Sequence, residues 1–198
     1  MAEIGVDPAA WSPWGACAGR LPATRPLLTL AVWPASSAWL LQADPEDAGF
    51  GRAAAAALGL APPAVVGDVA AAADGRRILA LGPDMWLLVA PTASAPDDAA
   101  LRALVDRFDH ASAMEQTEAR RWLAVDGPAA EELLARFVTL DLALPAFPAG
   151  TARGCRIGQV TGLIERVSPE RFLVAGPTST AEHMAAAFLD ALDAVAPE

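Results

Sequence analysis

Three residue types are missing from this chain of 198 residues, which contains no Lys, Asn or Tyr. The absence of Lys excludes a P-loop lysine and a Schiff-base lysine, and the absence of Asn excludes N-glycosylation. Every basic residue is therefore Arg, and 14 of them stand against 24 acidic residues, for a formal net charge of -10. Because no basic stripe remains to neutralise phosphates, we expect neither nucleic acid nor an anionic membrane surface as a partner.

Cysteine and histidine are scarce. The two cysteines, Cys17 and Cys155, form no C-x-x-C pair, and the only histidines are His110 and His183. These are too few soft ligands, without metal-ligand spacing, so we predict no metal site. The alternatives for the two thiols are a disulfide and, favoured in a cytosolic chain, burial as free cysteines.

Long hydrophobic runs are lacking as well. The longest uncharged run, residues 26–43, contains Pro34 and is shorter than the ~20 residues needed to cross a bilayer. Glu3 and Asp7 near the N-terminus, without a basic start, are not typical of a secretory signal. We expect a soluble cytoplasmic protein without membrane association.

Motifs that carry catalysis are also absent. No G-x-S-x-G nucleophile motif and no G-x-G-x-x-G dinucleotide fingerprint occurs. His110 ends an expected helix, His183 lies early in another, and the carboxylate pairs at 97–98 and 131–132 lie at helix starts, where the helix dipole explains them. We predict no catalytic, cofactor-binding or metal-binding residue in this chain.

Apolar residues make up 54% of the chain and charged residues 19%, which is enough for a sizeable core. Residues 1–26 lack periodicity and are expected to form an irregular N-terminal arm. Caps are predicted at Asp44 and Ser94, and Ser179 with Glu182 fits a capping box. The expected strands are 27–33, 76–81, 85–90, 121–125, 159–167 and 171–176, and the expected helices are 44–59, 94–108, 127–137 and 179–192.

This order reads strand–helix–strand–strand–helix twice, in units 27–110 and 111–198. The stretch "PDMWLLVAP" (83–91) matches "PERFLVAGP" (169–177) at an offset of 177 − 91 = 86 residues. We interpret this as an internal duplication; the alternative is that α+β chains reuse hairpins and caps. The predicted fold class is α+β, with two related βαββα units whose antiparallel sheets are covered by helices.

The stretch "LAVDGPAAEELLARF" (123–137) joins a strand to a helix. Gly127 permits a tight turn, Pro128 fits the first helical turn, and Asp126 or Gly127 is the expected cap. A lone Asp in this place is a cap far more often than a general base, so we predict a structural joint. The apolar stripe within 133–137 should pack on the sheet.

Tryptophan is the one unusual surplus, with six in the chain. Trp11, Trp14, Trp33 and Trp39 lie within the first 39 residues. Because Trp is enriched at protein interfaces, we identify these four as candidate partner-binding residues. That they cover the chain's own core is supported equally well.

Five segments in a fixed order resemble one family, the gamma subunit of heterotetrameric sarcosine oxidase, over about residues 27–195. These are "LGLAPP" (58–63), "RRILALGPDMWLLVAP" (76–91), "TEARRWLAVDGPAAEELLARF" (117–137), "LDL" (140–142) and "AFPAGT" (146–151). The second half also resembles the folate-binding aminomethyltransferase of the glycine cleavage system.

The resemblance implies a complex that oxidatively demethylates sarcosine to glycine, releases hydrogen peroxide and passes a one-carbon unit to tetrahydrofolate. It implies that FAD, FMN, NAD and tetrahydrofolate bind in the larger subunits. The gamma subunit would then be structural and non-catalytic, with alpha, beta and delta subunits as partners and alpha contacted most directly. Oxidases of other N-methyl amino acids or secondary amines would look similar.

A rival hypothesis is a stand-alone folate-binding or aminomethyltransferase-like protein. The chain is shorter than that full-length enzyme, and nothing in it matches the enzyme's acidic catalytic motif. A regulatory binding module is a third alternative.

Overall fold

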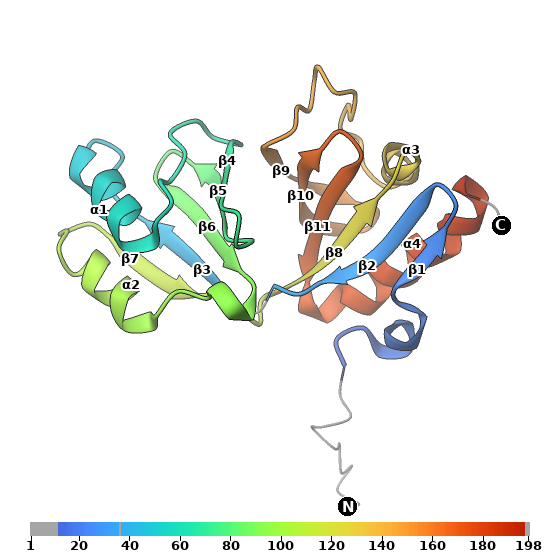
Figure 1. Ribbon diagram of the computed structural model, residues 1–198, viewed down its shortest axis with the longest axis horizontal. Helices are drawn as coiled ribbons and strands as arrows, with labels where there is room; N and C mark the ends of the chain where they lie inside the picture. The colour runs from blue at the N-terminus through green and yellow to red at the C-terminus, as the bar shows by residue number, and fades with distance from the viewer. Residues whose placement is uncertain (1–11, 36, 197–198) are drawn as a thin grey trace, which may run out of the picture.

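The computed structural model describes residues 12–35 and 37–196, which form two antiparallel sheets with helices packed on them (Figure 1). The strands are β1 Ala23–Arg25, β2 Leu28–Trp33, β3 Ser37–Gln42, β4 Val69–Ala71, β5 Arg77–Gly82, β6 Met85–Ala90, β7 Ser112–Glu115, β8 Arg120–Asp126, β9 Thr151–Ile157, β10 Val160–Ser168 and β11 Arg171–Pro177. The α-helices are α1 Ala48–Leu58, α2 Asp98–Val105, α3 Ala130–Ala135 and α4 Ala181–Val195, and the 3-10 helices are η1 Gly15–Arg20, η2 Thr92–Ser94 and η3 Thr178–Thr180. The predicted α+β class is confirmed.

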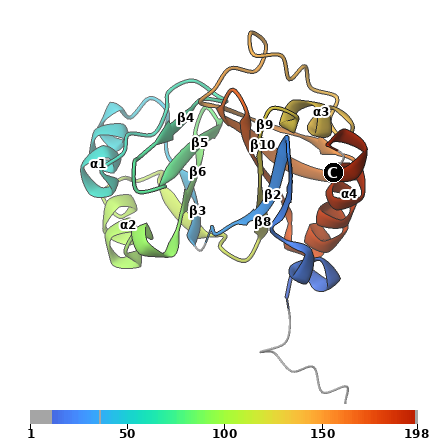
Figure 2. The same ribbon diagram turned by 45° about the vertical axis from the view of Figure 1, so that its right-hand side comes forward.

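Both sheets are apolar on both faces. Neighbouring residues along a strand point to opposite sides of a sheet, and in the central strands both sets are apolar and buried. In β6, Leu88 joins the cluster under α1 and α2, whereas Leu87 joins a separate cluster between the sheets. In β11, Phe172 joins the cluster under α3 and α4, and Leu173 faces the first sheet. The layers therefore run helix, sheet, sheet, helix (Figure 2).

The chain crosses between the sheets near its start and again in its middle. The five-stranded sheet has the order β4-β5-β6-β3-β7 and comes from residues 37–115, which we call the first unit. The six-stranded sheet has the order β1-β2-β8-β11-β10-β9, and residues 12–35 and 116–196 form the second unit around it. The first unit is thus inserted into the second.

This division differs from the expected boundaries. The strand at 27–33 was assigned to the first unit, but as β2 it pairs with β8 of the second. β7, which begins at Ser112, pairs back with β3. Of the arm expected at 1–26, the described part contains η1 and β1, and β1 extends the second sheet. Hydrophobic periodicity identifies a strand but not its partner, which explains the difference.

The two sheets share one pairing scheme, as an internal duplication requires. Leu79 pairs with Leu87 in the first unit, and Glu165 pairs with Leu173 in the second, at an offset of 165 − 79 = 86 residues. The irregularity between Ala80 and Gly82 recurs at the same offset between Arg166 and Ser168. The strand order also corresponds. β3 lies between β6 and β7, and β8 lies between β11 and β2, so each has a hairpin strand on one side and, on the other, a strand whose residues had been assigned from the sequence to the opposite unit. This correspondence supports the predicted duplication.

The helix caps differ from those predicted. The Asp47 carboxylate, not that of Asp44, caps α1 by accepting from the Gly49 N–H, and Asp97 rather than Ser94 caps α2. The capping box of Ser179 does not form, because η3 precedes α4 and the Glu182 carboxylate accepts from the Ala16 N–H of η1 instead.

Both cysteines are free thiols, with Cys17 buried and Cys155 partly buried. Burial raises the pKa of each thiol above its usual value. Among the helices of residues 12–35 and 37–196, none is long and apolar enough to cross a membrane.

Candidate functional site

The tryptophans predicted to bind a partner are divided between core and partial exposure. Trp14 is 7% exposed in the second unit's core, and Trp39 is 4% exposed in the first unit's core. Trp33 is partly buried and packs edge-to-face on Trp122 with ring centroids 5.6 Å apart. Trp11 lies outside the described residues. Trp14 and Trp39 therefore belong to the chain's own core, as the alternative interpretation has it, and their rings are not available to a partner.

The strand–helix joint at Asp126 contains one ion pair and one close backbone contact. The Asp126 carboxylate lies 2.9 Å from the Arg171 guanidinium across the β8–β11 pair. It does not cap α3, whose N-cap, Ala129, makes no side-chain bond, so the predicted cap is wrong. Gly127 has φ +133° and packs on the Leu27 carbonyl, an approach that only glycine permits.

The two histidines lie in different units. His110 is exposed beside the end of β3, and His183 lines an apolar cavity of about 190 Å³ with Phe137 and Phe188. Within the part of the chain that the structure describes, no three His, Cys, Asp or Glu side chains come together as metal ligands.

A broad hollow lies at the end of the first sheet where β3 leads into α1. Three adjoining cavities of about 390, 210 and 140 Å³ all include Asp44 in their walls. We call them together the acidic groove, lined by Gln42, Ala43, Asp44, Pro45, Asp47, Phe50, Gly51, Pro62, Pro63, Ala64, Pro83, Asp84, Trp86, Phe108, Asp109, His110, Ala111 and Ser112.

The floor of the acidic groove is an aromatic layer that belongs to the first unit's core, with only the edges of its rings exposed (Phe50 2%, Trp86 8%). Phe50 of α1 stacks on Trp86 of β6 with centroids 5.8 Å apart, and Phe108 meets Phe50 edge-to-face at 5.4 Å. The Trp86 indole N–H donates to the Pro63 carbonyl at 2.8 Å, which ties the proline-rich loop to the sheet. This wall is therefore preformed.

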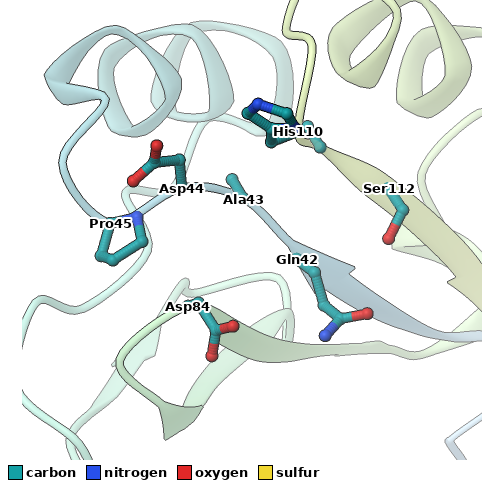
Figure 3. A pocket seen from close by; sticks show the side chains of 8 residues that line it. Gln42, Ala43, Asp44, Pro45, Asp84, His110 and Ser112 are labelled. Carbon is teal, nitrogen blue, oxygen red and sulfur yellow. The ribbon is translucent and has the colours of Figure 1, made fainter.

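The rim of the acidic groove carries the carboxylates of Asp44, Asp47, Asp84 and Asp109, which are all exposed. Backbone bonds set the positions of the first two: Asp44 accepts from the Glu46 N–H at 2.9 Å, and Asp47 accepts from Gly49. The Ala43 N–H donates to the Asp84 carbonyl at 3.1 Å, which joins the hairpin turn to the end of β3. Figure 3 shows the Asp44, Asp84 and His110 side chains arriving from three different segments.

Charge is not balanced on this rim. None of the eight ion pairs among the described residues includes a rim carboxylate. Arg107 lies nearby, with its guanidinium 5.9 Å from the centre of the Phe108 ring. The groove suits a cationic group better than proton transfer, which usually relies on a buried, perturbed acid or base.

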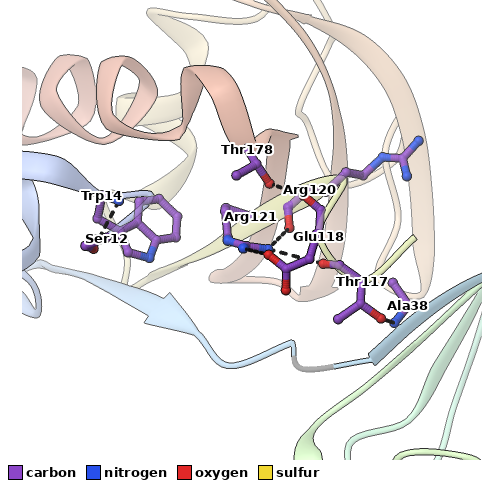
Figure 4. A network of polar contacts seen from close by, with 8 residues as sticks. All are labelled: Ser12, Trp14, Ala38, Thr117, Glu118, Arg120, Arg121 and Thr178. Atoms are coloured by element: carbon purple, nitrogen blue, oxygen red, sulfur yellow. Dashed lines mark hydrogen bonds and ion pairs between the residues drawn. The ribbon is translucent and has the colours of Figure 1, made fainter. Parts of the chain in front are cut away.

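Polar contacts fasten the crossing between the units (Figure 4). The Ala38 N–H donates to the Thr117 hydroxyl at 3.2 Å, and the Arg121 guanidinium donates to the Thr117 carbonyl and pairs with Glu118. The Thr178 hydroxyl donates to the Glu118 carbonyl at 2.5 Å. These bonds connect β3, the crossing segment and η3, so they fix how the chain passes between the sheets.

A buried ion pair also joins the units. The Arg77 guanidinium of β5 holds the Glu165 carboxylate of β10, with its Nε 2.8 Å from each oxygen. The Glu165 side chain is fully buried and that of Arg77 is 12% exposed. Burial raises the pKa of the Glu165 carboxyl above its usual value, although the hydrogen bond and charge of Arg77 act to lower it.

Sequence reasoning missed the acidic groove although it noticed several of its parts. Asp44 was predicted as a cap and His110 as a helix end, and Asp84 was noticed within the repeated stretch 83–91. Each local interpretation concerns one segment. The pairing of β3 with β6 brings Asp84 to Asp44, and the pairing of β3 with β7 brings His110 to the same end of the sheet. The Asp-Pro pair at 44–45 and the Pro-Asp pair at 83–84 were a weak signal, because such pairs also occur at 7–8 and 96–97.

The fold of this chain is shared with an aminomethyltransferase. Aminomethyltransferase T of the glycine cleavage system from Bartonella henselae matches with a TM-score of 0.57 and 19% identity, over 84% of this chain and 46% of that chain. At this identity the likeness concerns the fold alone. The model of the sarcosine oxidase, gamma subunit family, matches residues 42–192, and the chain belongs to this family.

Individual relatives agree with the family. Sarcosine oxidase subunit gamma of an Arthrobacter species is 32% identical over 152 residues, which cover 77% of this chain and 73% of that protein. The subunit of Corynebacterium sp. strain P-1 is 29% identical over 158 residues, 80% and 76% of the two chains. A chain of heterotetrameric sarcosine oxidase from Corynebacterium sp. U-96, solved with pyrrole 2-carboxylate, matches with a TM-score of 0.81 and 26% identity, over 95% of this chain and 97% of that chain.

Proposed function

We propose that this chain is the structural, non-catalytic gamma subunit of a heterotetrameric sarcosine oxidase. The observation that carries the proposal is the end-to-end match to a chain of that assembly, which leaves almost no part of either chain outside the shared fold. In the complex, sarcosine would be oxidised to glycine with release of hydrogen peroxide. The chain's own contribution would be to assembly.

The alpha, beta and delta subunits are the proposed partners, with alpha contacted most directly, and the complex is proposed to be cytoplasmic. FAD, FMN, NAD and tetrahydrofolate are proposed to bind in those partners. A non-catalytic role is supported by the polar groups of the second unit. The Asp126 carboxylate is paired with Arg171, and that of Glu165 with Arg77, so both are engaged in ion pairs within the fold.

Co-purification tests this function. The affinity-tagged chain, expressed together with the other oxidase subunits, is expected to recover them with flavin absorbance and sarcosine-dependent peroxide release. The tagged chain expressed alone is expected to show neither. Failure to recover any flavoprotein subunit would reject the proposal.

The rival, a stand-alone folate-binding or aminomethyltransferase-like protein, is tested on the same material. The likeness that favours it concerns the fold alone, and this chain spans about half of that enzyme. Binding of tetrahydrofolate to the isolated chain, measured by calorimetry, would support the rival over a purely structural role.

A further inference from the structure

We propose that the acidic groove of the first unit receives a positively charged segment, with Arg or Lys beside apolar side chains, from another subunit of the oxidase complex. This inference rests on the proposed function. It adds which surface of this chain contacts the other subunit and which kind of interaction holds the two together. Its support comes from the charge of the first unit, the unpaired rim and the preformed apolar floor.

Charge is concentrated in the first unit. Residues 37–115 contain 11 Asp and Glu against 5 Arg, a balance of 5 − 11 = −6. The described residues of the second unit contain 10 against 9, a balance of 9 − 10 = −1. A surface of one sign attracts segments of the opposite sign and directs their approach over about a Debye length, roughly 8 Å at physiological salt.

The rim concentrates this charge where a side chain can reach an apolar wall. Asp44 and Asp47 border the cavity whose other walls include prolines and the largely buried rings of Phe50 and Trp86. Asp84 borders the adjoining cavity, which shares Asp44 with the first. Arg and Lys carry apolar stems below their charged heads, so they can lie on such a wall while the head meets a carboxylate. A proline and aromatic wall also favours apolar neighbours in the same segment.

A second copy of this chain is a poor occupant. Its net charge of -10 repels an acidic rim, and all of its basic residues are Arg, several already held in ion pairs. The proposal therefore commits to a basic segment of a different subunit.

The first test removes charge from the rim. In the double variant Asp44→Asn and Asp84→Asn, the amide oxygen at position 44 can still accept from the Glu46 N–H, and the backbone bond to the Asp84 carbonyl is unaffected. We expect its association with the other oxidase subunits, measured by surface plasmon resonance, to slow by about tenfold at low salt and to lose most of its salt dependence. An unchanged rate and an unchanged salt slope would overturn the proposal.

The matched control removes two charges from the second unit. Glu170 holds the place in the β10–β11 turn that Asp84 holds in the β5–β6 turn, at the same offset of 170 − 84 = 86 residues. Glu170→Gln with Glu132→Gln alters net charge as much as the rim variant does, and Glu132 is exposed on α3. We expect this control to stay within about twofold of the parent rate. An equal loss in both variants would indicate general attraction and reject the groove.

The second test fills the groove. A Cβ added to Gly51 of α1 meets no atom within 4 Å, so Gly51→Leu should fold and project into the cavity beside Phe50. We expect about tenfold weaker affinity, mainly through faster dissociation. The control is Ala56→Leu, at an exposed position of the same helix, which should bind as the parent does.

A third measurement is independent of the complex. In NMR titrations of the isolated chain, a synthetic peptide of alternating Arg and Leu should shift the Gly51 amide, the Asp84 amide and the Trp86 indole, and a peptide with Glu in place of Arg should not.

If the parent recovers the oxidase subunits but rim and groove variants do likewise, the groove proposal fails while the proposed function stands. If the parent recovers no subunit, the proposed function fails and the peptide footprint decides on the groove, because shifts elsewhere would reject it. A dimer in light scattering that Gly51→Leu dissociates would replace the partner segment with a second copy.

Discussion

Asp126 and Arg171 are direct cross-strand partners at the end of β8, and each side chain is more than two-fifths exposed. Exposed ion pairs contribute little, because water screens the charges and both side chains lose rotamer freedom. We expect Asp126→Ala to lower the free energy of unfolding by no more than about 1 kcal/mol. The free energy of this pair is measured by urea unfolding of the parent, the two single variants at 126 and 171, and the double variant.

Turnover separates this structural role from a catalytic one. In the assembled oxidase carrying Asp126→Ala, peroxide release per flavin should equal that of the parent. A fall of about a hundredfold, which is the scale of a lost general base, with flavin content intact would make Asp126 a catalytic residue.

Gly127 is under a much stricter constraint than its neighbour. Its φ of +133° is unfavourable for any residue with a side chain, and an added Cβ would lie 2.4 Å from the Leu27 carbonyl oxygen. Gly127→Ala should therefore cost more than about 2 kcal/mol, through strain and displacement of the start of β2. The control is Gly154→Ala, whose Cβ would meet only the tip of Leu163, at 3.9 Å. Equal stability of the two variants in thermal unfolding would contradict this account.

The Arg77–Glu165 pair connects β5 to β10, and the positions that correspond to it through the duplication hold different residue types. At the offset of 86 residues Arg77 corresponds to Leu163 and Glu165 to Leu79, and these two leucines lie in the same cluster between the sheets. One half of the interface thus uses an ion pair where the other uses apolar contact. Breaking a buried pair leaves an unpaired charge, whereas replacing both partners by apolar residues is often neutral or stabilising.

We therefore expect opposite results from single and double substitution. Arg77→Leu alone should lower the free energy of unfolding by about 3–5 kcal/mol. The double variant Arg77→Leu with Glu165→Leu should be as stable as the parent or more stable, by up to about 4 kcal/mol. Denaturant unfolding of the three proteins at neutral pH measures both values. A double variant as unstable as the single would show that the pair supplies geometry that leucines cannot.

The same pair predicts a pH dependence with a definite sign. Burial raises the pKa of Glu165, because lost hydration outweighs the hydrogen bonds and charge of Arg77. A carboxyl with a higher pKa in the folded chain stabilises the fold below its unfolded pKa, about 4.3, and this contribution is lost as pH rises through the folded pKa. Glu165→Gln cannot ionise, so parental stability relative to this variant should fall as pH rises from about 4 to 7. A relative rise, measured by urea unfolding, would mean that the pairing outweighs desolvation.

The hairpins were predictable from sequence because each consists of two apolar runs around a turn. The β5–β6 and β10–β11 pairs both follow this pattern. The edge strands β4 and β7 could not be found, since their exposed and partly buried residues show no apolar alternation. The acidic groove was out of reach for a related reason, because strand pairing, which periodicity does not reveal, brings Asp44 and Asp84 together.

At the scale of the molecule, the insertion of one unit into the other makes two sheets depend on one another. Leu79, Leu87 and Val89 of the first unit share a buried cluster with Trp122, Leu163 and Leu173 of the second. Separation would expose this cluster and the Glu165 carboxylate to water, at a cost of roughly 25 cal/mol per Å² of apolar surface. The contacts at the crossing add a covalent and hydrogen-bonded connection at one end.

We therefore predict that the two units unfold together, in one cooperative transition. With 5-fluorotryptophan incorporated, the 19F signals of Trp86 and Trp14 report the first and second unit cores, respectively. Both signals should lose native intensity at the same urea concentration. Ile78→Ala tests the coupling further, because Ile78 is fully buried in the first unit's own cluster and does not belong to the one between the sheets. This change should cost about 2–5 kcal/mol and lower both midpoints equally, since neither sheet can keep its inner face buried without the other. A shift of the Trp86 midpoint alone would show instead that the units are thermodynamically independent domains joined only by the chain.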